Sequence, residues 1–395
     1  MQTPLYVSQF NVVRPSFEKP QEDAIRWLAQ AHAQAELRAG SPNGRVDLNS
    51  EFFEKVIGRF GCSPDKIANR GHELSDFSHT NWDQMRVFNT ANSPSGADME
   101  ARQRIYDELV RVRCDDLFPQ NFRFARDLMH VSCTGYVSPS PLQRLVAERG
   151  AASSVRVFHA YHMGCYAALP ATRWASAMAL QSFSEGLSDE SAAVDVAHSE
   201  LCTLHFNPML HSPEQLVVQS LFADGFIRYR VSARAQEVHN GRALKILAMN
   251  EEQIPGTADA MTWLPLPWGM AMTLSRDVPA LISSSVRGFV DRLMMKSGYS
   301  SSEILPRLVY AIHPGGPKII DHLQTLFEAT DEQVAASRSV LRRFGNMSSA
   351  TLPHIWNDIL SDSQKYPVGT CVLSLAFGPG LTTAGSLFEV VGDQK

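Results

Sequence analysis

Strand-like and helix-like segments alternate along both halves of this sequence. The strand-like segments are short apolar runs rich in β-branched and aromatic residues, and they lie at 128–133, 155–161, 194–206, 243–250, 308–313, 371–376 and 387–391. The helix-like segments carry helix-forming residues with apolar positions at helical spacing, and they lie at 21–40, 98–112, 142–149, 166–182, 278–296, 318–329, 334–344 and 352–360. Because sheets and helices bury their apolar faces against each other, this alternation predicts a layered α/β fold.

The length of the chain suggests more than one lobe. It has 395 residues, which is long for a single hydrophobic core. A polar turn around Asn240 lies within the stretch 225–245, where a boundary is expected. We therefore predict two halves, 1–230 and 231–395, of similar pattern although no sequence repeat is visible.

Charge and hydropathy exclude several classes of protein. The net charge is −5, and no cluster of lysine and arginine offers the basic surface that nucleic acid requires. The first residues lack the pattern of a signal peptide, and no stretch approaches the ~18 uninterrupted apolar residues of a membrane span. The six cysteines are scattered as free thiols of a reducing compartment would be. We expect a cytoplasmic protein with neither a nucleic-acid nor a membrane partner.

Cys165 is the candidate nucleophile. It follows a strand-like run and a glycine and precedes a helix-like segment, so we expect it at a strand-to-helix junction. The N-terminus of a helix lowers the pKa of a thiol and favours the reactive thiolate. The alternatives are a buried structural cysteine or a metal site formed with His159 and His162, but no second cluster completes a ligand set. The sequence therefore favours a nucleophile and predicts no bound metal.

Two further segments carry candidate hydrogen-bond donors. His313 ends a strand-like run and precedes a Pro-Gly-Gly-Pro turn, which permits unusual backbone angles that can hold the ring over a cavity. Asn346 precedes small residues, and its amide either donates to a carbonyl oxygen or caps the following segment. The turn that starts at Phe377 either packs against the cavity or simply connects two strands.

These segments together resemble the type III polyketide synthases, the chalcone and stilbene synthase-like family. The matching motifs are Met163-Gly164-Cys165, Ser199-Glu200, Leu221-Phe222-Ala223-Asp224-Gly225, His313-Pro314-Gly315-Gly316-Pro317, Gly345-Asn346-Met347-Ser348-Ser349-Ala350 and Phe377-Gly378-Pro379-Gly380-Leu381. They occur in the order of the family and extend over most of the chain.

The resemblance implies a fold, an assembly and a reaction. The fold is a thiolase-like αβαβα sandwich of two duplicated α/β halves, and the assembly is a homodimer without a bound cofactor. Cys165 would be acylated by a thioester carried on coenzyme A or on the phosphopantetheine of a carrier protein. His313 and Asn346 would stabilise the enolate of a second thioester, and the enolate would attack the acyl-Cys165 in a Claisen condensation.

Departures from the family pattern concern the cavity. Cys202 and His205 replace threonines, Met272 replaces a phenylalanine, and Trp263 occupies a position that is commonly small. The resemblance also places Phe222, Ser348 and Phe377 at the cavity. Because bulky residues reduce its volume, we expect few condensations and a triketide-sized or α-pyrone product.

The resemblance places the thioester arm and the dimer contact less specifically. Lys55 and Arg59 lie where the family binds the arm, although Pro64 and Ala68 stand where basic residues are expected. Delivery by a carrier protein is therefore an alternative to coenzyme A. Ser138 would approach the partner subunit's cavity, and the preceding Cys133 is expected to be a packing residue.

Three alternative functions stay open. Some stand-alone ketosynthases that resemble this family join two carrier-bound β-keto chains into an α-pyrone in bacterial antibiotic pathways. The chain is otherwise a catalytically silent partner subunit, which retention of Cys165, His313 and Asn346 disfavours. A cysteine acyl hydrolase would need an acidic residue to orient His313, and the sequence assigns none.

Overall fold

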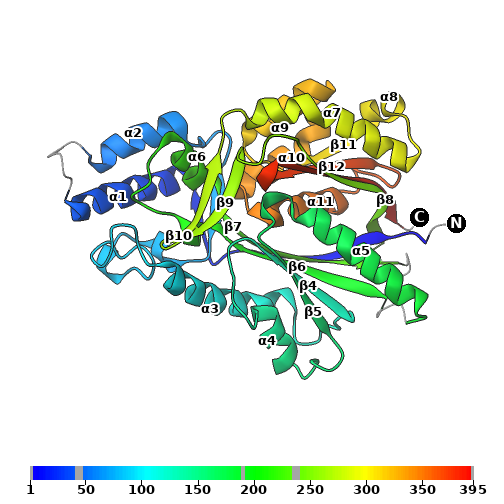
Figure 1. The fold of residues 1–395 in the computed structure, drawn as a ribbon, viewed down its shortest axis with the longest axis horizontal. Coiled ribbons are helices and arrows are strands. Elements are labelled where there is room, and N and C mark those ends of the chain that lie inside the picture. Colours follow the sequence, from blue (N-terminus) through cyan, green and yellow to red (C-terminus); the bar gives the residue numbers. More distant parts are fainter. Residues whose placement is uncertain (1–2, 41–47, 188–191, 234–240, 393–395) are drawn as a thin grey trace.

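A computed structural model describes residues 3–40, 48–187, 192–233 and 241–392 (Figure 1). The strands are β1 (Tyr6–Val13), β2 (Phe17–Pro20), β3 (Asn69–His72), β4 (Asp127–Ser132), β5 (Arg156–Tyr161), β6 (Ala193–Leu201), β7 (Asp224–Ser232), β8 (Arg242–Gln253), β9 (Met261–Leu266), β10 (Gly269–Leu274), β11 (Val309–Ile312), β12 (Cys371–Gly378) and β13 (Thr382–Gly392). The helices are α1 (Gln21–Ala39), α2 (Ser50–Phe60), α3 (Met99–Leu117), α4 (Pro141–Glu148), α5 (Ala168–Ser184), α6 (Pro213–Leu221), α7 (Val278–Ser297), α8 (Ser301–Ile304), α9 (Pro317–Phe327), α10 (Asp331–Phe344) and α11 (Thr351–Ser361).

The main sheet repeats one topology twice. Its nine strands have the order β11-β12-β13-β8-β1-β7-β6-β4-β5. In the first half β4 runs parallel to β6, and β6, β7 and β1 are successively antiparallel. In the second half β11 runs parallel to β12, and β12, β13 and β8 are successively antiparallel. The two halves meet where β1 pairs with β8, at Tyr6 opposite Lys245 and Val7 opposite Leu244.

The helices form three layers around these strands. Figure 1 shows α3 and α4 below the strands of the first half, α7 and α9 above those of the second half, and α5 and α11 between them. Both central helices contact strands of both halves, α5 at β6 and β13 and α11 at β7 and β11. The layered α/β architecture predicted from the sequence is therefore observed. The division into 1–230 and 231–395 remains a proposal, and its boundary falls within β7.

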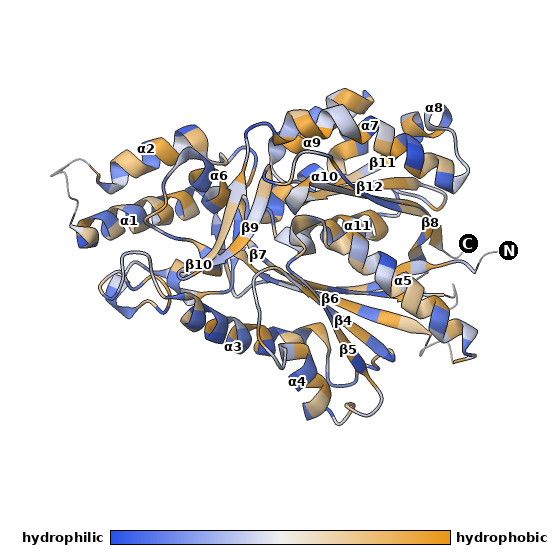
Figure 2. Cartoon of the chain, in the orientation of Figure 1, coloured by the Kyte–Doolittle hydropathy of each residue, from blue (hydrophilic) through white to orange (hydrophobic). Residues whose placement is uncertain are grey.

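Residue size explains how the central layer fits. The face of α5 that meets the sheet carries the buried Ala168, Ala171, Ala175 and Ala179, and these small side chains let the helix approach the strands closely. Figure 2 shows hydrophobic residues along the central strands and a mixture of hydrophilic and hydrophobic residues on α3. No helix among the described residues is long and apolar enough to cross a membrane.

Two regions differ from the sequence-based expectations. The strand expected over 194–206 ends at Leu201, and Cys202–His205 form a 3-10 turn instead. This turn forms because the Asp224 carboxylate accepts hydrogen bonds from the backbone and the side chain of Thr203. The hairpin of β9 and β10, which the sequence pattern did not predict, forms a separate two-stranded sheet. Both features line the cavity described below.

Substitution of Trp356 tests how much the packing of the central helical layer contributes to stability. Its fully buried indole on α11 packs against Tyr229 of β7 and Phe388 of β13, and its Nε1 donates a hydrogen bond to Ser374 Oγ at 2.8 Å. We predict that Trp356→Ala lowers the free energy of unfolding by about 3–5 kcal/mol, as is typical of large buried aromatic residues. Urea denaturation measures this loss. The control Trp174→Ala, on the more exposed face of α5, is expected to change it by about 0.5 kcal/mol or less.

Candidate active site

A strained turn presents Cys165. The chain leaves β5 and passes through His162, with φ of 64°, and Gly164, with φ of 77°, before α5 begins. A Cβ atom on Gly164 would lie 2.6 Å from Cδ of Pro379, so both the angle and the space require glycine here. The turn between β12 and β13 therefore packs directly against the nucleophile turn. Cys165 lies at the predicted strand-to-helix junction.

Burial controls the protonation of Cys165. The side chain is buried, and its Sγ lies 3.9 Å from Ser348 Oγ. Removal from water raises the pKa of the thiol to about 12, although the Ser348 hydroxyl and the nearby Asn346 amide act in the opposite direction. The expectation of a lowered pKa is therefore wrong for the protein without substrate.

His313 offers an unoccupied imidazole. Its backbone N–H donates to Leu375 O at 2.8 Å, which continues the pairing of β11 with β12. Both ring nitrogens are buried and have no hydrogen-bond partner among the described residues. Burial lowers the pKa of the ring to about 3, so it is neutral near pH 7. A neutral imidazole carries one N–H donor, which is available to a ligand.

Asn346 offers an amide donor with a fixed orientation. It follows α10, and its backbone N–H donates to Leu221 O at 3.0 Å. The side-chain Oδ1 accepts hydrogen bonds from Ser348 N at 2.9 Å and Thr351 Oγ1 at 3.4 Å. Its Nδ2 is buried without a partner among the described residues. Because buried donors are normally satisfied, this group and His313 are suited to hold a ligand oxygen.

Cys165, His313 and Asn346 line one cavity, which we call the outer cavity. Its volume is about 880 Å³, and Phe222, Met272 and Phe377 also line it. The sulfur, the imidazole and the amide come from segments far apart in sequence. The structure thus brings together the three residues that the sequence singled out.

A second cavity, which we call the inner cavity, meets the first at Cys165. Its volume is about 50 Å³. The sequence-predicted residues that line it are Cys202, His205, Phe222, Trp263, Met272 and Ser348. It has room for only a few atoms beyond Cys165. His313 and Asn346 do not line it, so the two donors face the outer cavity alone.

Hydrogen bonds fix two large residues of the inner cavity. His205 Nδ1 accepts from Met270 N at 3.2 Å, which leaves Nε2 to donate to Thr134 O at 2.7 Å. Trp263 Nε1 donates to Cys133 O at 2.8 Å. The small volume is therefore maintained by bonded side chains and not only by loose packing.

Cys133 and Glu200 lie behind the nucleophile. The Cys133 Sγ accepts a hydrogen bond from Gly164 N at 2.8 Å, so this thiol supports the turn as well as packing. The fully buried Glu200 accepts hydrogen bonds from Cys133 N at 3.0 Å and from Thr134 Oγ1 at 3.0 Å, and also from Ser349 Oγ. Sequence reasoning noted Glu200 only as part of a motif. Its adjacency to Cys133 depends on the pairing of β4 with β6.

Three cationic residues line the outer cavity. Arg59 of α2, Arg276 before α7 and Lys318 of α9 line it. Lys55 lines neither cavity and pairs with Glu51 at 2.7 Å. Sequence reasoning missed Arg276 and Lys318, although Lys318 directly follows the Pro-Gly-Gly-Pro turn, which was a usable signal. Ser138 is exposed to solvent in the single chain.

Metal ligands do not cluster in the described part of the chain. No group of three or more histidine, cysteine, aspartate or glutamate side chains is arranged there to hold an ion. All six cysteines are free thiols.

Comparisons with known proteins agree with the site. A sequence profile described as chalcone and stilbene synthases, C-terminal domain, matches residues 245–392. Type III polyketide synthase C of Arabidopsis thaliana is 30% identical over 267 residues, which cover 66% of each chain. The chain is therefore similar to chalcone and stilbene synthases over its C-terminal part, and to type III polyketide synthases over about two thirds of its length.

Two other similar proteins extend the comparison. An alpha-pyrone synthesis polyketide synthase-like protein of Mycobacterium tuberculosis is 27% identical over 67% of this chain and 65% of its own length. The matched region thus spans just under two thirds of each of these relatives. The C-terminal type III polyketide synthase domain of a Dictyostelium type I/III hybrid superposes with a TM-score of 0.78 at 20% identity, over 98% of this chain and 99% of that one. The thiolase-like fold predicted from the sequence is confirmed.

Alkylation by iodoacetamide tests the raised pKa of Cys165. Well below its pKa a thiol gains about tenfold more thiolate per pH unit. We therefore predict that the alkylation rate of Cys165 rises about tenfold per unit between about pH 7 and 9, as followed by peptide mass spectrometry. Ser348→Ala should slow the reaction further, because the Ser348 hydroxyl lowers the pKa of the thiol. A rate that levels off within this pH range would contradict the assignment.

Proposed function

We propose that this protein is a condensing acyltransferase that forms carbon–carbon bonds through an acyl-Cys165 intermediate. The observation that carries the proposal is the outer cavity, in which two buried donors without partners, on His313 and Asn346, face the same space as Cys165. Donors arranged in this way before substrate binds stabilise negative charge that develops on a carbonyl oxygen.

The first step is transfer of an acyl group. Cys165 Sγ attacks the thioester carbonyl, a carbon–sulfur bond forms to the enzyme, and the bond to the donor thiol breaks. The proton of Cys165 passes to the departing thiolate, so charge is balanced. Since the resting thiol has a raised pKa, the proton leaves only as the bond forms.

The second step is condensation. A second thioester binds in the outer cavity with its carbonyl oxygen at the N–H groups of His313 and Asn346. Loss of carbon dioxide from a carboxylated thioester, or transfer of a proton to water, produces an enolate that these donors stabilise. The enolate carbon attacks the acyl carbonyl, the carbon–sulfur bond to Cys165 breaks, and the released thiolate takes up a proton from solvent. Because the His313 ring is neutral and has no hydrogen-bond partner among the described residues, its N–H can donate to the substrate without breaking another interaction.

Neither the hydrolase nor the silent-subunit alternative finds support in the site. An acid that would orient His313 is not seen, since neither ring nitrogen has a partner among the described residues. A silent subunit would not need buried donors that face a nucleophile across a cavity.

The inner cavity supports a short product. A volume of about 50 Å³ leaves little room for a growing chain, and Trp263 and His205 are held in place by hydrogen bonds. We propose few condensations and release of an α-pyrone or a related short polyketide. The similar protein of Mycobacterium tuberculosis, described as an alpha-pyrone synthesis polyketide synthase-like protein, supports the same type of product.

The outer cavity favours a second candidate function. Apart from its donors and cations, it is lined by apolar side chains, which include Val217, Leu221, Val278, Ile282 and Ile319. Such a surface suits an apolar chain better than a small polar extender. The second candidate is therefore the joining of two carrier-bound β-keto chains, as in bacterial antibiotic pathways.

The cations of the outer cavity suggest the thioester donor, and the edge strand β5 suggests where a second subunit binds. Arg59, Arg276 and Lys318 suit the phosphates of coenzyme A or of a carrier-bound phosphopantetheine arm. We propose one of these donors, no bound cofactor, a homodimer and a cytoplasmic location. The edge strand β5 carries the exposed Phe158, and we propose that this edge and Ser138 belong to the surface that meets the second subunit.

Acyl labelling tests the assignment of roles. With a radiolabelled acyl thioester, we expect Cys165→Ala to abolish covalent labelling and Cys371→Ala, the control thiol, to retain it. His313→Gln and Asn346→Asp should still become labelled, but they should form condensation product at least about 100-fold more slowly, as is typical for loss of an oxyanion donor. Labelling that persists in Cys165→Ala would contradict the nucleophile. Labelled wild-type protein that only hydrolyses its acyl group would contradict condensation.

The products formed from two different sets of substrates distinguish the two candidate functions. With a short acyl starter and a malonyl thioester, the primary proposal predicts triketide-sized products, because the inner cavity has no room for longer chains. The second candidate predicts an α-pyrone from two β-ketoacyl thioesters without any malonyl donor. Mass spectrometry identifies the products. A majority of chains extended three or more times would contradict both the small cavity and the short product.

A further inference from the structure

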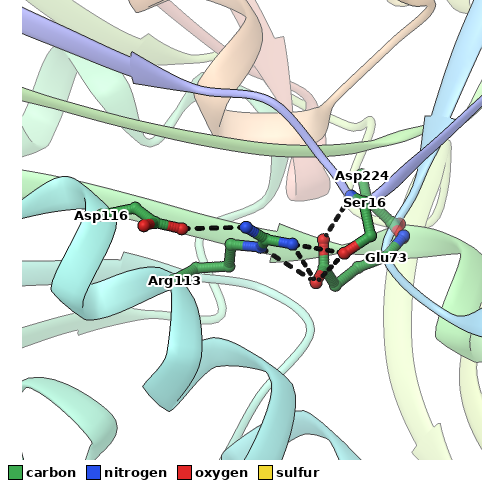
Figure 3. A network of polar contacts seen from close by, with 5 residues as sticks. All are labelled: Ser16, Glu73, Arg113, Asp116 and Asp224. Carbon is green, nitrogen blue, oxygen red and sulfur yellow. Dashed lines mark hydrogen bonds and ion pairs between the residues drawn. The ribbon is translucent and has the colours of Figure 1, made fainter.

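A buried carboxylate links two walls of the inner cavity. Asp224, the first residue of β7, is 1% exposed and lies two residues after Phe222. One carboxylate oxygen accepts from Thr203 N at 2.9 Å, and the other accepts from Thr203 Oγ1 at 2.8 Å and from Glu73 N at 2.7 Å. Figure 3 shows Asp224 beside Glu73, which continues a polar network through Ser16 and Arg113 to Asp116 at its other end.

The first wall is the 3-10 turn that follows β6. It supplies Cys202 and His205 to the inner cavity, and Thr203 lies between them. Apart from Asp224, the turn is held by the buried Arg102, which donates to Leu204 O and, at 3.0 Å, to Phe206 O. The His205 ring adds its hydrogen bonds with Thr134 O and Met270 N. Asp224 is the group that binds both the backbone and the side chain of Thr203, and it ties them to the Phe222 segment.

The second wall is Phe222, which lines both cavities. Its carbonyl accepts a hydrogen bond from the buried Arg70 Nη1 at 2.8 Å, and the next residue, Ala223, donates its N–H to Asn346 O at 2.8 Å. Asp224 therefore belongs to a segment that is fixed to the catalytic Asn346 on one side. Through its carboxylate the same segment is fixed to the turn at Thr203 on the other.

We propose that Asp224 is a positioning residue that limits product length by holding the Cys202–His205 turn against the Phe222 segment. The inference rests on the proposed condensing function. With both Thr203 hydrogen bonds present, the turn cannot retreat and the inner cavity stays near its observed volume. When a bond is lost, the turn gains freedom, and the cavity accepts one more extension unit before release.

The charge state of Asp224 provides a second way to loosen the turn. Burial raises the pKa of this carboxyl to about 7, while its hydrogen bonds act in the opposite direction. The ionisable groups near it are Arg70, Glu73 and Cys202, and Arg113 pairs with Glu73. Protonation replaces an acceptor by an O–H donor, so the turn is held less firmly below about pH 7 and more firmly above it.

A pair of substitutions at Thr203 tests the hydrogen bond from the Thr203 hydroxyl to the Asp224 carboxylate. Thr203→Val removes the hydroxyl at nearly constant volume, while Thr203→Ser retains it. We expect the Val variant to raise the ratio of longer to shorter product about fivefold, the effect of one typical hydrogen bond, and the Ser variant to stay within about twofold of wild type. Asp116→Asn, at the solvent end of the same network, is the matched control and should leave the ratio unchanged.

The pH profile gives a readout that needs no variant. In the wild-type protein the ratio should rise as pH falls from about 8 to 6, and in Thr203→Val it should vary less. The inference is overturned if the ratio of longer to shorter product does not change with pH and is the same in Thr203→Val and Thr203→Ser. If Thr203→Val does not fold, a ratio in the wild-type protein that does not change with pH overturns it. Absence of any condensation product from wild type overturns the proposed function itself, and the inference with it.

Discussion

The packing of two helices between two sets of strands is the constraint on which the site depends. α5 begins just after Cys165, and α11 begins just after Asn346 and the short turn that follows it. Because the two halves share one topology and both helices lie in the central layer, their N-terminal ends meet at one place. Trp356, with aromatic neighbours on β7 and β13, holds this layer to strands of both halves. A nucleophile from one half and a hydrogen-bond donor from the other are thereby brought to the same cavity.

Burial then determines the electrostatics of that cavity. Burial raises the pKa of the Cys165 thiol and lowers that of the His313 ring, so it favours the uncharged form of each, and Asn346 carries no charge. Charge appears only when a substrate supplies it, as a thiolate leaving group or an enolate. The donors of His313 and Asn346 are buried, and a hydrogen bond from a buried donor to such a charge is strong. Burial thus disfavours a free thiolate, and the two donors offset this penalty when charge develops on the substrate.

Much of the fold followed from local patterns. The helices over 21–40 and 278–296 and the strands over 128–133 and 308–313 were predicted within two residues of their observed bounds, because their apolar spacing matches their burial. The strand expected over 194–206 was too long, since its last residues are drawn into a turn by Asp224, a residue of the following strand. Arg276 was missed because an exposed cation carries no pattern that distinguishes a cavity wall from any other surface, whereas the position of Lys318 next to the Pro-Gly-Gly-Pro turn was a signal that was not used.

Local residue order determined that Cys165 lies between a strand and a helix, that His313 ends a strand and that Asn346 precedes a turn. These are properties of neighbouring residues and of backbone preferences. The tertiary structure decided that the three face one cavity, that two cavities of about 50 and 880 Å³ meet at Cys165, and that the pKa of its thiol is raised. The reason is physical: volume and hydration depend on which distant segments surround a group. The spacing of apolar residues in a helix or strand predicts that a residue is buried, but it does not predict which residues surround it.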